Sequence, residues 1–64
     1  MRVNDLEGIL KSPEGGILMC VVYDTWKGEV WESGCSAEYA IKEYGGCNLV
    51  GIAADGDKVV LKIS

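Results

Sequence analysis

The stretch Ile17-Leu18-Met19-Cys20-Val21-Val22-Tyr23 decides the fold of this 64-residue chain, because seven consecutive apolar or aromatic residues predict a strand that is apolar on both faces. Neighbouring side chains of a strand point to opposite faces, so a strand with one face in water alternates apolar and polar residues. A chain of this length builds about one two-layer core. We therefore expect the second face of this strand to be covered from outside the chain, most simply by a second copy.

The composition is that of a folded, acidic protein. Hydrophobic residues make up 48% of the chain, and ten Asp and Glu against six Lys and Arg give a formal charge of -4. This charge argues against non-specific binding to nucleic acid or to anionic membranes. No stretch approaches the ~20 apolar residues of a membrane span. Asp5, Glu7 and Pro13 stand where a signal peptide has its apolar stretch, so we expect a cytoplasmic protein.

The first half of the chain predicts a helix followed by a hairpin. Asn4 and Glu7 have the spacing of a capping box, which begins a helix, and Pro13 ends that helix. The apolar strand then covers residues 16–24, and a return strand covers 29–33 after a polar loop.

The second half predicts another helix and another hairpin. Ser36 is suited to cap a helix whose apolar stripe ends at Tyr44, and Gly45 supplies a left-handed residue after it. Asp55-Gly56 predicts a two-residue type I′ turn, and counting outward pairs Ile52 with Val59. This register divides the hairpin side chains between the two faces of the sheet. One face carries Val50, Ile52, Val59, Leu61 and Ile63. The opposite face carries Leu49, Gly51, Ala53, Lys58, Val60 and Lys62.

These elements predict a single α+β domain over residues 1–64, with the order αββαββ. We expect a four-stranded antiparallel sheet with two short helices on one face, which leaves the other face open. The segments 4–33 and 36–64 resemble each other, as a duplicated αββ unit would. Any two such units with glycine after the helix would also share these features, so both explanations stay open.

The available chemistry is sparse. The chain has no histidine, and Cys20, Cys35 and Cys47 are too widely spaced for a zinc site or a disulfide framework. We therefore expect free thiols, no metal and no cofactor. Cys35 precedes the second helix, whose dipole would lower its pKa, so a thiol-dependent enzyme is one alternative. The leading expectation is a protein without catalytic activity.

Large apolar side chains favour protein binding as the activity. Trp26 falls in a polar hairpin loop, where a tryptophan either contacts a partner or folds back over the hairpin. The predicted interface residues are Tyr23, Trp26, Trp31, Leu49 and Val60. A small nucleic-acid-binding protein is the other alternative, in which Lys58 and Lys62 contact phosphates and a tryptophan stacks on bases.

The succession of segments resembles a known group of proteins. The helix from Asp5 to Leu10, the strand end Val21–Asp24, the return strand and the closing hairpin from Ala54 to Ile63 are similar to small αββαββ proteins of prophages and conjugative elements of Gram-positive bacteria. The resemblance implies an accessory role in a mobile element, such as interference with a host defence or regulatory protein. It supplies no catalytic residues. We therefore expect a homodimer that binds an unidentified protein partner.

Overall fold

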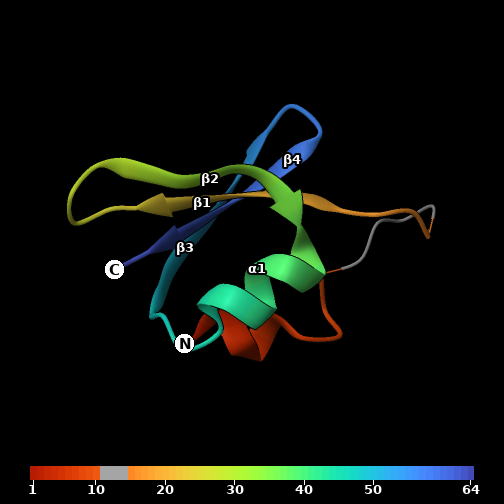
Figure 1. Cartoon of the computed structure of the whole chain (residues 1–64), viewed down its shortest axis with the longest axis horizontal. Helices are drawn as coiled ribbons and strands as arrows, with labels where there is room; N and C mark the ends of the chain where they lie inside the picture. The colour runs from red at the N-terminus through yellow and green to blue at the C-terminus, as the bar shows by residue number, and fades with distance from the viewer. Residues whose placement is uncertain (11–14) are drawn as a thin grey trace.

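Four strands form one mixed sheet in the computed structural model, which describes residues 1–10 and 15–64 (Figure 1). The strands are β1 (Met19–Asp24), β2 (Glu29–Ser36), β3 (Leu49–Asp55) and β4 (Lys58–Ile63), in the spatial order β2-β1-β4-β3. The hairpins β1–β2 and β3–β4 are antiparallel, but the central strands β1 and β4 are parallel. The prediction of a fully antiparallel sheet is therefore wrong. Turn residues determine pairing only within each hairpin, whereas the segment between β2 and β3 decides which strands meet in the centre.

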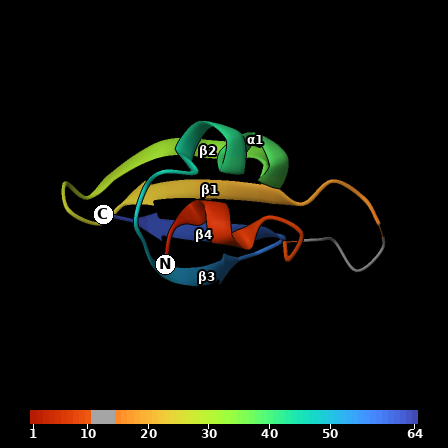
Figure 2. The same ribbon diagram turned by 90° about the horizontal axis from the view of Figure 1, so that it is seen from below.

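One α-helix and one 3-10 turn lie side by side against the same face of the sheet (Figure 2). The helix α1 (Ala37–Tyr44) begins as predicted, because the Ser36 Oγ accepts a hydrogen bond of 3.1 Å from the Tyr39 N–H. The predicted first helix is wrong, since in the described residues 1–10 the chain forms the short turn η1 (Val3–Leu6) instead of an α-helix. It begins where the Arg2 backbone N–H donates to the Asp5 Oδ2 at 2.8 Å rather than at Asn4. The predicted end at Pro13 lies outside the described residues.

Gly45 ends α1 for a different reason from the one predicted. Its φ of -57° and ψ of -32° are right-handed, so the expected left-handed conformation is wrong. A Cβ at this position would lie 3.0 Å from the Asn4 Oδ1 and would contact the Ile41 backbone oxygen. The Asn4 N–H also donates to the Gly45 carbonyl at 3.0 Å. A glycine is needed here because η1 crosses the end of α1 at close range.

The β3–β4 turn is displaced by one residue from the predicted position. Asp55 pairs with Lys58, so the loop residues are Gly56 and Asp57, and Gly56 has φ +63° while Asp57 has no positive φ. Glycine at the first loop position is typical of a type II′ turn, not of the predicted type I′ turn. Ile52 therefore lies opposite Leu61 instead of Val59. Alternation along both strands is unchanged, so most of the predicted face assignments are kept.

A β-bulge changes the face assignment at the start of β3. The register shifts between Leu49 and Gly51, and Leu49 lies opposite Ile63 in the core, whereas Val50 is half-exposed. The predicted position of Leu49 on the open face is therefore wrong. A bulge adds one unpaired residue and inverts the alternation of side chains beyond it.

The core lies between the helix-covered face of the sheet and the two helical segments. It contains Val3, Leu6, Cys20, Val22, Cys35, Ala37, Ala40, Leu49, Leu61 and Ile63. The apolar strand is shorter than predicted, because β1 begins at Met19 and Ile17 is exposed. On the second face of β1, Val21 is only 9% exposed, so at this position the chain covers itself.

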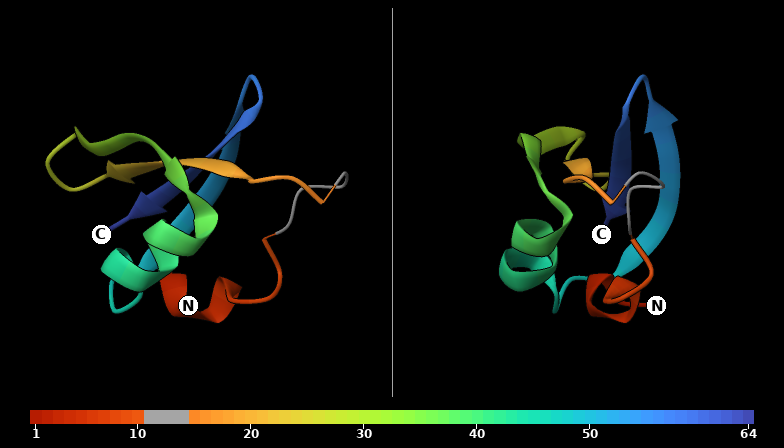
Figure 3. Two further views of the ribbon diagram at one scale, coloured as in Figure 1. Left: turned by 45° about the vertical axis from the view of Figure 1, so that its right-hand side comes forward. Right: turned by 90° about the vertical axis from the view of Figure 1, so that its right-hand side faces the viewer.

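The sheet is strongly twisted. The hairpin β3–β4 crosses the hairpin β1–β2 obliquely, and both helical segments lie near one end of the sheet (Figure 3). The N-terminal residues run beside the start of β3, where the Leu49 N–H donates to the Met1 carbonyl at 2.7 Å. In residues 1–10 and 15–64, no helix lies on the other face of the sheet.

Candidate interaction surfaces

The face of the sheet opposite the helices, called here the helix-free face, carries an apolar centre. The registers place on it Met19, Val21, Tyr23, Val30, Gly51, Ala53, Lys58, Val60 and Lys62. Val30 is 54% exposed and Met19 is 37% exposed, while Val60 and Tyr23 are partly buried. Two predicted interface residues, Tyr23 and Val60, therefore share this face.

Two lysines cover part of the helix-free face with their aliphatic stems. The Lys58 Nζ donates to the Ser33 carbonyl on β2 at 3.3 Å, so this side chain crosses β1 from β4. Lys62 lies against Gly51, where a Cβ would be 3.4 Å from the Lys62 Cδ. Such stems cover apolar surface while their ammonium groups stay in water. The face is thus apolar in its centre, with the ammonium groups of Lys58 and Lys62 and the carboxylate of Asp55 around it.

Trp26 lies in the loop between β1 and β2, with its side chain 82% exposed. Asp24 fixes the loop, since its Oδ1 accepts from the Trp26 N–H at 2.9 Å. The Thr25 hydroxyl also donates to the Ile63 carbonyl at 2.9 Å. The alternative in which Trp26 folds back over the hairpin is wrong. A fixed loop that holds a tryptophan in water is typical of an interface residue.

Aromatic side chains gather where α1 lies beside the edge strand β2. A shift of register places Trp31 in a bulge of β2, and its ring centroid lies 5.9 Å from that of Tyr44, at an interplanar angle of 45°. The Tyr44 hydroxyl donates to the Glu32 Oε1 at 2.9 Å. Trp31, Tyr39, Tyr44, Glu32 and Glu43 are called here the aromatic surface.

Negative charge dominates the aromatic surface. The hydrogen bond to Glu32, together with partial burial, raises the pKa of Tyr44 to about 12. The charges of Glu32 and then of Glu43 raise the pKa of Tyr39 above its ordinary value. Tyr39 and Tyr44 were not among the predicted site residues. An aromatic residue at position 39, on the polar side of α1, is the sequence signal for this surface.

The predicted interface residues do not form one site. Tyr23 and Val60 lie on the helix-free face, Trp26 stands in the loop, and Trp31 lies on the aromatic surface. Leu49 is 7% exposed and belongs to the core, so a partner has little access to it.

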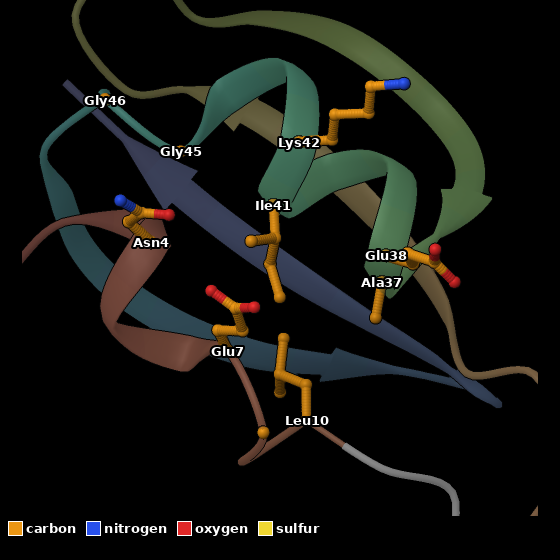
Figure 4. A pocket seen from close by; sticks show the side chains of 10 residues that line it. Asn4, Glu7, Leu10, Ala37, Glu38, Ile41, Lys42, Gly45 and Gly46 are labelled. Carbon is orange, nitrogen blue, oxygen red and sulfur yellow. The ribbon is translucent and has the colours of Figure 1, made fainter.

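A groove of about 540 Å³ separates η1 from α1. Leu10 and Ile41 face each other across it, and Glu7 projects toward the same space (Figure 4). In the described part of the chain, every buried side-chain nitrogen or oxygen has a hydrogen-bond partner. The groove therefore contains, among its described residues, no buried polar atom that lacks one. The groove is lined by apolar side chains, Leu10, Ala37 and Ile41, and by polar ones, Asn4, Glu7, Glu38 and Lys42.

The cysteine chemistry differs from the expectation for Cys35. Its thiol is buried and donates to the Cys20 carbonyl at 3.7 Å. Burial, and then the charge of Glu32, raises the pKa of Cys35, which is opposite to the expected effect of the helix dipole. All three cysteines are free. No group of three or more His, Cys, Asp or Glu side chains suited to a metal occurs in residues 1–10 and 15–64.

Comparison with protein-family models, with curated proteins and with solved structures finds no match. The resemblance to proteins of mobile elements therefore stays a prediction from the sequence. Within the described ranges, no helix has the length and hydrophobicity needed to cross a membrane.

Proposed function

We propose that this protein is a non-catalytic protein-interaction module that acts as a homodimer through the helix-free face. The observation that carries the proposal is the exposure of Val30 and Met19 on a sheet face that no helix of the described residues covers. Two sheets packed face to face lie about 10 Å apart and bury the side chains between them. Pairing two helix-free faces would join their apolar centres, while the ammonium groups of Lys58 and Lys62 reach the rim.

The homodimer would leave a second set of apolar side chains free to bind another protein. Trp26 is held in solvent by the β1–β2 loop, and the aromatic surface lies at the α1 side of β2. Exposed tryptophan and tyrosine side chains are enriched among the residues that dominate binding energies. The sequence resemblance adds a mobile-element role to the proposal, with a host defence or regulatory protein as the partner.

Sedimentation of two matched valine variants tests the homodimer. Val30 and Val50 are 54% and 52% exposed and lie on the two edge strands, but only Val30 belongs to the helix-free face. We expect Val30→Lys to weaken self-association at least about tenfold, because it places an unpaired charge in the interface. Val50→Lys should dimerise like the unmodified chain. An unmodified chain that is monomeric at tens of micromolar would contradict the homodimer.

Nucleic-acid binding is a second candidate, favoured by one observation. Lys62 lies opposite Tyr23, and Lys58 lies on the same face four residues earlier on β4, so two cations and an aromatic ring share this face. Trp31 lies beside Tyr44 at the α1 side of the sheet, so it does not join them. A gel shift with single-stranded and double-stranded DNA at low salt tests this function. Retardation that is lost in Lys58→Gln and Lys62→Gln would support it, and no retardation at micromolar protein would exclude it.

A further inference from the structure

We propose that the aromatic surface is a binding site for an arginine side chain of the protein partner. Glu32 would accept hydrogen bonds from the guanidinium group, and the rings of Trp31 and Tyr39 would contact its planar face. This inference rests on the proposed function, since it gives the chemistry of the partner that the module binds.

The geometry of the aromatic surface holds Glu32 in place and leaves part of it free. The Tyr44 hydroxyl donates to one carboxylate oxygen, Oε1, at 2.9 Å, so Oε2 can accept from a ligand. The hydrogen-bond partner of Glu32 in the described part of the chain is thus a tyrosine rather than a cation. The Trp31 ring packs on Tyr44, and this contact holds the Trp31 side chain beside the Glu32 carboxylate.

The exposed rings next to Glu32 suit a flat cation. Trp31 and Tyr39 are each 44% exposed, and the Trp31 ring packs on Tyr44. Aromatic faces attract cations, and a guanidinium group stacks on such rings while it donates to a carboxylate. Lysine offers a compact, strongly hydrated charge that stacks less well.

The distribution of charge favours a cation at this place. Glu32 and Glu43 both act on Tyr39, so two carboxylates create a negative potential over the rings. Lys58 and Lys62 lie on the helix-free face, on the other side of the sheet. A basic partner is therefore attracted to the aromatic surface, and it does not compete with the proposed dimer interface.

Titration with acetyl-arginine-amide, followed by amide and indole shifts in nuclear magnetic resonance spectra, tests this site. The matched control is the citrulline analogue, which has nearly the same shape but no charge. We expect arginine to shift the signals of Trp31, Tyr39 and Tyr44, and citrulline to leave them unchanged. Glu32→Gln, which keeps an acceptor for the Tyr44 hydroxyl, should weaken binding about fivefold or more. Glu29→Gln removes the same charge from the start of β2 and should bind like the unmodified chain.

Further arms of the titration separate the alternatives. Trp31→Leu should also weaken binding, and it tests the site independently if Glu32→Gln does not fold. Equal shifts with citrulline, unchanged binding by Glu32→Gln, or shifts confined to other residues would overturn the proposal. Tighter binding of free arginine than of the capped amide would assign the site to the free amino acid instead. A failed titration would leave the sedimentation test of the homodimer unaffected, because that test probes the opposite face.

Discussion

The two faces of the sheet share the same central strands but differ in what covers them. On the helix-covered face, Val22, Leu61 and Ile63 are at most 1% exposed beneath η1 and α1. On the helix-free face, Val21 and Val60 alternate with these residues along β1 and β4, and lysine stems partly cover them. The difference shows that an apolar strand does not need a helix on both sides. Side chains of the same sheet supply part of the cover, and Met19 and Val30 stay exposed.

Neighbouring residues of β4 provide the strongest test of this comparison. Leu61 is fully buried on the helix-covered face, so Leu61→Ala should lower the free energy of unfolding by about 3 kcal/mol, from lost burial and the cavity left behind. Val60 is partly buried on the helix-free face, and Val60→Ala should cost less than about 1 kcal/mol at low protein concentration. Urea unfolding followed by circular dichroism measures both. Equal losses would show that the two faces contribute equally to the stability of the monomer.

Two neighbouring glycines test the tightest contact on the covered side, with a smaller expected effect. Gly45→Ala should destabilise the fold by about 1 to 2 kcal/mol, because the new methyl group meets Asn4 and the Ile41 backbone oxygen. Gly46→Ala meets no atom within 4 Å and has no positive φ, so its effect should stay within about 0.5 kcal/mol. Thermal unfolding of the two variants makes the comparison. Similar melting temperatures would show that η1 moves aside at little cost.

Local signals in the sequence predicted the elements that depend on nearby residues. The Ser36 cap and the apolar stripe after it gave α1, and turn residues gave both hairpins. The parallel pairing of β1 with β4 joins residues about 40 positions apart, such as Cys20 and Val59, so no local pattern encodes it. The position of the β3–β4 turn was predicted one residue too early, because Asp55-Gly56 and Gly56-Asp57 both contain suitable turn residues.

The candidate surfaces were less predictable than the fold, because bulges decide where side chains point. A bulge moves Leu49 into the core, and another places Trp31 beside Tyr44. Neither bulge has a distinct signal in the sequence. Residue type nevertheless identified Trp26 and Trp31 as exposed aromatic residues, since both side chains are accessible. The convergence of Tyr39 with Glu32 depends on how α1 lies against β2, which only the three-dimensional structure shows.

The smallest expected effect concerns the link between α1 and β2 at the rim of the covered face. The hydrogen bond to Glu32 raises the pKa of Tyr44 to about 12, above its ordinary value near 10. A raised folded-state pKa means that this stabilisation is complete below about pH 10 and is lost as the pH rises toward 12. Tyr44→Phe should therefore cost less than about 1 kcal/mol at about pH 8, because the group is near the surface, and still less at about pH 12.

Tyr23→Phe, which removes a hydroxyl from the helix-free face, serves as the control in the same urea titrations. An equal loss of free energy at both pH values would contradict a contribution that is lost as the Tyr44 hydroxyl ionises. No loss at either pH would show that the ring rather than its hydroxyl holds α1 against β2. The two faces would then differ only in apolar packing.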